Sequence, residues 1–132
     1  MSKYLLDTDT LIDFSKDREP VRTRLLELIG EGHEVAICAI NEAEFYAGLP
    51  PAKRQQIEEF FLALTYWPIT QAVARASGMM RYDLARQGKT ILLADCLLAA
   101  VAIEQGATIL TSNTEDYPQP EVTTLSLRET PA

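Results

Sequence analysis

Short apolar segments alternate with longer helical segments along this chain, and this alternation limits its fold more than any other feature. The expected strands are residues 3–6, 34–38, 66–69, 107–111 and 122–127. Short strands that are rich in apolar residues and separated by helices pair in parallel, with helices covering both faces of the sheet. The sequence therefore predicts an α/β fold around a central parallel sheet.

The segments between these strands repeat apolar residues at helical spacing and begin and end at recognisable residues. The expected helices are residues 8–14, 20–29, 41–46, 51–64, 70–87 and 94–105. Asn41 and Thr70 are suited to capping the third and the fifth of them. Gly106 is expected to end the last one, which is apolar along most of its length and should be covered on most sides.

The 132 residues, of which 47% are hydrophobic, suit one domain spanning residues 1–132 with a substantial core. No apolar run approaches the roughly 20 residues that cross a bilayer. The apolar run at residues 4–6 is too short for a signal peptide and is followed at once by an acid. We expect a cytoplasmic protein without a membrane segment, in which Cys38 and Cys96 are buried free thiols.

The formal net charge is −7, from 19 acidic and 12 basic residues. Taken alone, this charge argues against binding nucleic acid, which usually needs a basic surface. The count misleads if several acids form a metal site, because bound cations cancel part of the negative charge. The bases are also grouped, at Lys53-Arg54 and again over residues 75–89.

Four acids follow the expected strands: Asp7, Glu44, Asp95 and Asp116. Ligands of parallel sheets bind beyond the carboxyl ends of the strands, so all four can lie at one rim. Singly, each has a plain explanation, such as capping a turn or favouring a helix N-terminus. Asp95 is harder to explain in this way, because apolar residues flank it on both sides and a half-buried carboxylate needs a partner.

Carboxylates that are forced together repel one another and take up protons unless a cation joins them. An oxygen-rich set without His or Cys favours Mg²⁺, with Mn²⁺ as the second choice. Further oxygens that could bind water or phosphate come from Thr8, Asp9, Thr111, Ser112 and Asn113. The chain has one histidine, His33, and this excludes catalysis by paired histidines. We expect His33 to lie in a surface loop. No Gly-rich phosphate loop or nucleophile elbow is present, so metal-activated water remains.

Four segments, residues 4–12, 41–48, 94–100 and 109–117, together resemble the PIN-domain family, most of all its VapC-type toxins. The resemblance implies a three-layer α/β/α sandwich and a Mg²⁺- or Mn²⁺-dependent endoribonuclease toxin. It also implies that the four acids bind the metal and are catalytic, and that Thr8, Asp9, Thr111 and Asn113 support the site. It also implies a homodimer and a small antitoxin whose C-terminal segment crosses the active cleft.

This chain departs from the family pattern at several positions. Asp9 stands where many relatives have Asn, and Tyr117 replaces the usual Phe. Glu42 competes with Glu44 for the second acid, although the residues around Glu44 match the family better. Contacts to the RNA substrate are expected from Arg81, Arg86 and Lys89.

Two other classes use acids after a first strand. A phosphohydrolase of the haloacid-dehalogenase type has an Asp-x-Asp like residues 7–9, but it needs Thr or Val where Leu11 stands, a later Lys and a paired acid. A receiver-like Mg²⁺-binding signalling domain needs a Lys after a late strand, and residues 110–113 contain none. Both fit the sequence less well than a nuclease.

Overall fold

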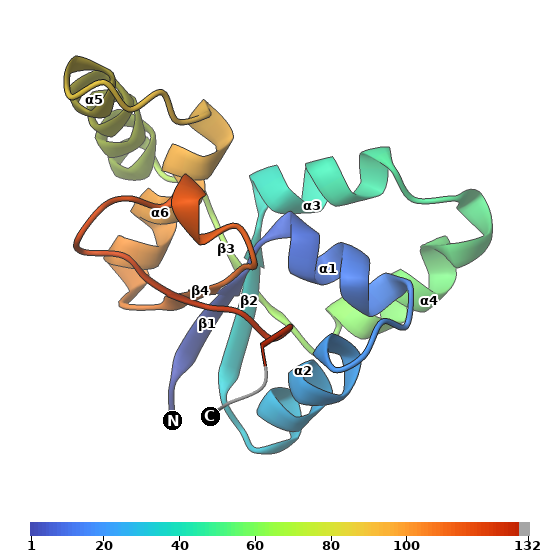
Figure 1. Cartoon of the computed structure of the whole chain (residues 1–132). Coiled ribbons are helices and arrows are strands. Elements are labelled where there is room, and N and C mark those ends of the chain that lie inside the picture. The colour runs from blue at the N-terminus through green and yellow to red at the C-terminus, as the bar shows by residue number, and fades with distance from the viewer. Residues whose placement is uncertain (130–132) are drawn as a thin grey trace.

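A computed structural model describes residues 1–129, which form a single five-stranded parallel sheet in the order β3-β2-β1-β4-β5 (Figure 1). The strands are β1 (Lys3–Leu6), β2 (Glu34–Cys38), β3 (Thr65–Trp67), β4 (Thr108–Leu110) and β5 (Thr123–Leu125). All five expected strands are present. The third ends at Trp67, before Pro68, because proline has no N–H to donate to a neighbouring strand.

The helices are α1 (Thr8–Ser15), α2 (Val21–Gly30), α3 (Ala39–Ala47), α4 (Arg54–Phe61), α5 (Gln71–Arg86) and α6 (Leu93–Gln105), with the 3₁₀ turns η1 (Pro51–Lys53) and η2 (Thr114–Asp116). Thr70 caps α5 by accepting from the Val73 N–H at 3.1 Å, as expected. Gly106 ends α6 with a φ of 66°, which confirms its expected role. The fourth helix is shorter than expected because its first turn is 3₁₀ and it stops at Phe61.

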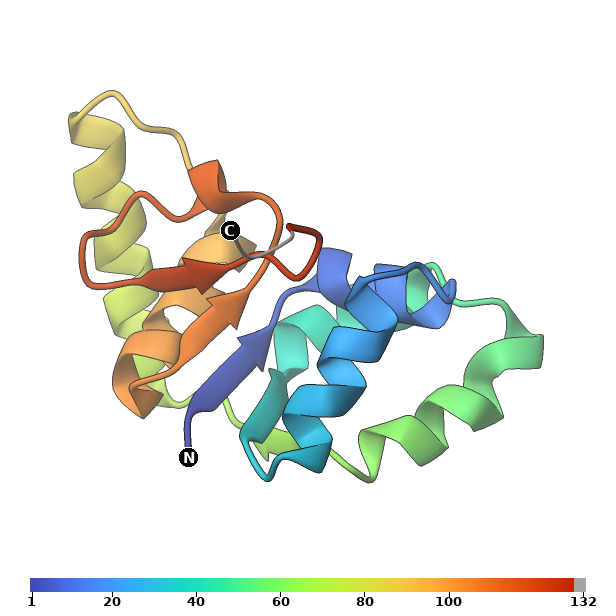
Figure 2. The ribbon, with the colours of Figure 1, turned by 60° about the horizontal axis from the view of Figure 1, so that its bottom comes forward.

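Helices cover both faces of the sheet, which confirms the expected three-layer α/β/α sandwich. Successive residues of β1 point to opposite faces: Leu5 packs into the core beneath α5 and α6, and Leu6 into the core beneath α1, α2 and α4. Figure 2 shows the two groups of helices on either side of the strands. In residues 1–129, no helix is long and apolar enough to span a membrane. Cys38 and Cys96 are buried and unbonded, as expected.

The segment after β5 is held against α1 by an ion-pair network. Asp13 is buried and pairs with Arg18 at 3.0 Å and with Arg128 at 2.7 Å. Burial alone would raise the pKa of Asp13, but hydrogen bonds from Arg128 and Arg18 outweigh it and lower the pKa. The Ser126 hydroxyl also lies 3.1 Å from that of Ser112, in the loop after β4. The last described residues are therefore part of the packed domain.

Candidate active site at the carboxyl end of the sheet

The site lies where β1 ends between its two neighbours. Strand β1 pairs with β2 on one side and with β4 on the other, so the chain order reverses at this strand. In open α/β sheets such a point leaves a crevice beyond the carboxyl ends of the strands. Asp7 comes directly after β1, and its N–H donates to the Leu110 carbonyl at the end of β4, at 3.1 Å.

Asp7 is held on both sides. It is 7% exposed and caps α1, with Oδ1 accepting from the Thr8 N–H at 2.7 Å. Its Oδ2 accepts from the Tyr117 hydroxyl at 2.8 Å. Burial raises the pKa of Tyr117, and the nearby Asp7 carboxylate raises it further, so the phenol stays protonated and keeps donating. This contact fixes the orientation of the Asp7 carboxylate.

Asp95 stands in the first turn of α6. Its pKa is raised to about 6, mainly by burial and then by the charges of Asp116, Asp7 and Glu44, while a hydrogen bond from Tyr117 lowers it in part. Asp116, Asp7 and Glu44 therefore lie within electrostatic range of Asp95. We call Asp7, Glu44, Asp95 and Asp116 the acidic rim.

Glu44 is the member of the acidic rim that comes from α3, and it lies on the exposed side of that helix. Its Oε1 accepts from the Thr8 hydroxyl at 3.1 Å, which links α3 to the first turn of α1. The pKa of Tyr46 is raised mainly by burial, then by Glu58 and then by Glu42. Glu42 is not among the causes that raise the pKa of Asp95. Glu44 is therefore within electrostatic range of Asp95, whereas the electrostatic effect of Glu42 is on Tyr46.

Asp116 reaches the acidic rim from η2. Its pKa is raised by burial first, then by Glu115 and Asp9. Asp9 fixes the loop that leads to η2, because its Oδ2 accepts from the Ser112 N–H at 2.8 Å. The polar residues of this loop shape it from within: the buried Thr111 hydroxyl accepts from the Asn113 N–H at 3.1 Å. The hydrogen bonds of Asp9, Thr111 and Asn113 therefore fix the conformation of this loop.

The donor chemistry of the acidic rim suits a hard divalent cation, although its side chains do not form a closed cage. Within residues 1–129, no three Asp, Glu, His or Cys side chains stand close enough together to hold a metal ion. The raised pKa values of Asp95 and Asp116 come partly from repulsion between carboxylates, which a cation would relieve. The metal site therefore stays a prediction.

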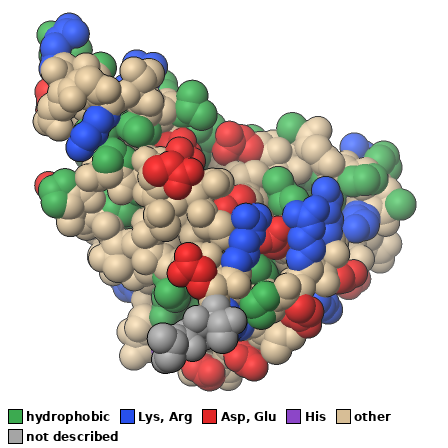
Figure 3. Space-filling view, viewed as in Figure 1, with side chains coloured by type: hydrophobic (Ala, Val, Ile, Leu, Met, Phe, Trp, Pro, Cys, Tyr) green, Lys and Arg blue, Asp and Glu red, His purple; other side chains and the backbone are tan. Residues whose placement is uncertain are grey.

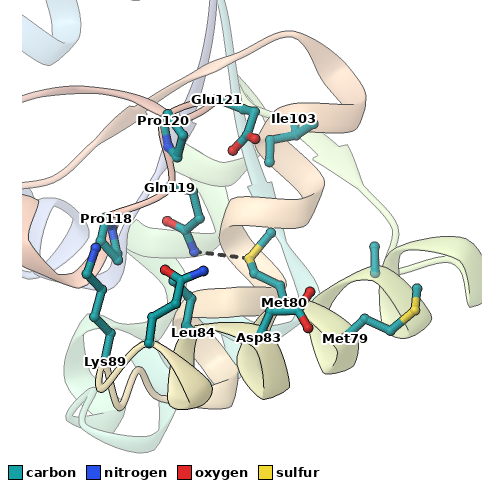
Figure 4. Close-up of a pocket in the computed structure, with 12 residues that line it drawn as sticks. Met79, Met80, Asp83, Leu84, Lys89, Ile103, Pro118, Gln119, Pro120 and Glu121 are labelled. Atoms are coloured by element: carbon teal, nitrogen blue, oxygen red, sulfur yellow. Dashed lines mark hydrogen bonds between the residues drawn. The ribbon is translucent and has the colours of Figure 1, made fainter.

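The three bases expected to contact RNA have different neighbours in the structure. Arg81 lies close enough to Cys96, beside Asp95, to lower the pKa of that thiol, although burial raises it more. Arg86 stacks on Tyr82, with 4.2 Å from its guanidinium carbon to the ring centre. Lys89 lines a 590 Å³ cavity between α5, α6 and residues 118–121, where the Gln119 amide donates to the Met80 sulfur at 3.0 Å (Figure 4).

Two residues of the site were underestimated from the sequence. The hydroxyl of Tyr117 would be missing from a Phe at this position, and with it the bond to Asp7. Asn41 was expected to cap the third helix, but α3 begins two residues earlier and Asn41 lies inside its first turn. Its buried amide accepts from the Cys38 N–H at 2.8 Å and donates to the Leu6 carbonyl, so it joins the ends of β1 and β2.

The raised pKa of Asp95 gives the metal-free protein a defined pH dependence. The folded state holds this proton up to about pH 6, whereas the unfolded chain releases it near 3.8, so stability is expected to fall as pH rises through that window. A divalent cation favours the ionised form and should therefore raise the melting temperature more at pH 7.5 than at pH 5.

Thermal unfolding with MgCl₂ or with EDTA at the two pH values measures this difference. In Asp95→Asn the pH dependence between 4 and 6 should become smaller, and the part that remains is expected from Asp116, whose pKa is also raised. An equal gain from Mg²⁺ at both pH values would contradict the assignment of Asp95.

Residues 4–121 match the family model described as "PIN domain". "Ribonuclease VapC19" of Mycobacterium tuberculosis is 32% identical over 116 residues, which cover 86% of this chain and 91% of the relative. "tRNA(fMet)-specific endonuclease VapC" of Shigella flexneri is 28% identical over 122 residues, covering 89% and 91%.

Solved structures share the fold. VapBC2 from Rickettsia felis, bound to a DNA fragment from its promoter, superposes with a TM-score of 0.81 at 23% identity, covering 94% of this chain and 98% of the other. A toxin–antitoxin complex from Klebsiella pneumoniae gives a TM-score of 0.73 at 25% identity, covering 92% and 96%.

Proposed function

Because this chain belongs to the PIN-domain family, we propose that it is a metal-dependent endoribonuclease and the toxin of a toxin–antitoxin pair. The observation that supports the proposal is the acidic rim: Asp7 is held at the carboxyl end of β1 by Tyr117 and Leu110, Glu44 is bonded to Thr8 beside it, and their charges help to raise the pKa of Asp95. Family membership over residues 4–121 also displaces the haloacid-dehalogenase and receiver alternatives.

The relatives support the two halves of this proposal separately. The names of the M. tuberculosis and S. flexneri relatives describe a ribonuclease and an endonuclease. The K. pneumoniae structure is a complex of a toxin with its antitoxin. We extend both properties to this chain, and we keep the homodimer as an expectation from the family.

The four carboxylates of the acidic rim would hold Mg²⁺ or Mn²⁺. When bound, such a cation supplies positive charge that lowers the pKa of a coordinated water and offsets charge on the phosphate. The chain's own contribution is to fix the ligands. Tyr117 and the Thr8 N–H hold Asp7 in one orientation, and the Thr8 hydroxyl steadies Glu44. Asp9 holds the loop that brings Asp116 to the rim.

Hydrolysis by a metal-activated water does not use the ribose 2′-hydroxyl, which gives a sharp test. The purified protein is expected to cleave a single-stranded RNA with Mg²⁺ or Mn²⁺ and to lose this activity in EDTA. By family analogy the products carry 5′-phosphate and 3′-hydroxyl ends. A substrate with one 2′-deoxyribose at the cleaved linkage should still be cut, as gel electrophoresis and mass spectrometry of the fragments would show. Equal cleavage in EDTA, or a 2′,3′-cyclic phosphate product, would refute the mechanism.

A further inference from the structure

We propose that a pocket between α1, α3 and η1 binds one nucleotide of the RNA, next to the linkage that is cut. The pocket has a volume of 320 Å³ and is lined from three elements. Its lining includes Ile12 of α1 and Lys16 directly after it, Glu44 and Phe45 of α3, Leu49 and Lys53. The inference rests on the proposed function, because it names where the substrate of that function lies.

Glu44 connects this pocket to the acidic rim. The same side chain contributes to the shift at Asp95, accepts from Thr8, and forms part of the pocket wall. A strand of RNA whose reacting phosphate lies at the rim therefore has its next nucleotide at the mouth of the pocket.

The charges of the pocket suit a phosphate. Lys16 and Lys53 line it, and within the part of the chain that the structure describes neither one pairs with a carboxylate. Nearby arginines are committed elsewhere, since Arg18 and Arg128 both pair with Asp13. The Lys53 ammonium donates to the Ser15 carbonyl at 3.0 Å, which orients it and leaves two protons free. Figure 3 shows Lys and Arg side chains gathered over α1, beside the acidic side chains.

The walls of the pocket suit a base. Ile12, Phe45 and Leu49 give it an apolar lining, and the last two are buried. Its volume lies near the lower end of the range of small-ligand sites, about 300–1,000 Å³, which suits a single nucleoside. Proteins that bind single-stranded RNA place unstacked bases against apolar side chains and hold the backbone with basic ones.

The larger cavity beside α5 is a weaker candidate for the same role. It has two acids, Asp83 and Glu121, with the one base Lys89, whereas the pocket beside α1 has two lysines with the one acid Glu44. A peptide from a protein partner is the other class of ligand that an apolar pocket could take. We favour RNA because two lysines without carboxylate partners stand beside a site that must bind a polyanion.

The test removes the two charges and leaves polar, unbranched side chains, with the variant Lys16→Gln/Lys53→Gln. Lys3→Gln is the matched control, because Lys3 starts β1 at the opposite end of the sheet. Binding is followed by fluorescence anisotropy of a labelled single-stranded oligoribonucleotide with Ca²⁺, over a range of salt concentrations, and cleavage is followed with Mg²⁺. Circular dichroism melting checks that each variant is folded.

The double variant is expected to weaken RNA binding about tenfold and to lower the slope of log K against log salt by about 1.4, or about 0.7 for each lost phosphate contact. KM should rise while kcat changes little, and Lys3→Gln should behave as the unaltered protein. Unchanged binding and slope in the double variant would overturn the proposal, and so would a larger effect from Lys89→Gln. So would a double variant that keeps its RNA affinity but no longer binds its protein inhibitor, which would assign the pocket to a peptide. If the unaltered protein binds RNA through these lysines but cleaves none, the proposed function fails and the binding site stands.

Discussion

Asp95→Asn is expected to slow RNA cleavage by at least about a hundredfold while leaving the protein folded and slightly more stable. Both effects have one cause. The substitution keeps the shape of the side chain and removes a charge that burial and three neighbouring carboxylates destabilise. Loss of that charge relieves repulsion in the metal-free protein, and it also removes a ligand that a divalent cation would need. Opposite changes in activity and stability separate a functional acid from a structural one.

The measurements are the initial rate of RNA cleavage with Mg²⁺ and the melting temperature in EDTA at pH 7.5. Asp7→Asn is expected to lose activity similarly, since Asn is also a good helix cap and the fold should survive. Glu104→Gln provides the control, because it removes an acid from the exposed, far end of α6 and should change neither quantity. Full activity in both Asp7→Asn and Asp95→Asn would end the nuclease assignment.

Asn41→Ala is expected to lower the free energy of unfolding by about 3 kcal/mol. Asn41 is fully buried, and its removal leaves the Cys38 N–H and the Leu6 carbonyl without their partner. A buried polar group that loses its partner destabilises a protein by about 1–3 kcal/mol, and two are affected here. Because Leu6 precedes Asp7, cleavage activity should fall as well.

Urea unfolding followed by circular dichroism measures this loss as a lower midpoint with an unchanged m-value. Gln56→Ala is the matched control, since it removes an exposed amide from α4 and should alter stability by less than about 0.5 kcal/mol. A loss below about 1 kcal/mol for Asn41→Ala would mean that water replaces the amide and that the tie between the strands is weak.

The parts of this protein that follow from local pattern were predictable. Alternating apolar segments indicated the parallel sheet, and the position of Asp7 directly after β1 indicated the rim where ligands bind. The flanks of Asp95 indicated partial burial, and the structure places Asp95 partly buried in the first turn of α6. Each of these inferences needs only residues that are close together in the sequence.

The parts that depend on contacts between distant segments were not predictable in the same way. Nothing near Asn41 shows that its amide reaches Leu6, and nothing near Tyr117 shows that its hydroxyl reaches Asp7, 110 positions away. Asp9 offered two interpretations, a further ligand or extra negative charge, and the structure gives it a third role through Ser112. Side-chain hydrogen bonds across a fold depend on the assembled backbone, which spacing along the chain does not describe.

The way in which Asp13, Arg128 and Ser126 tie down the chain after β5 has a practical meaning for anyone who modifies this protein. Trimming the chain back to β5 would remove Arg128, leave Arg18 as the only cation paired with the buried Asp13, and detach Ser126 from the loop that leads to Asp116. A bulky fusion partner joined close behind Arg128 would disturb the same contacts with Asp13 and Ser112. Met1 lies exposed at the opposite end of the sheet, so an affinity tag or a fluorescent reporter belongs there.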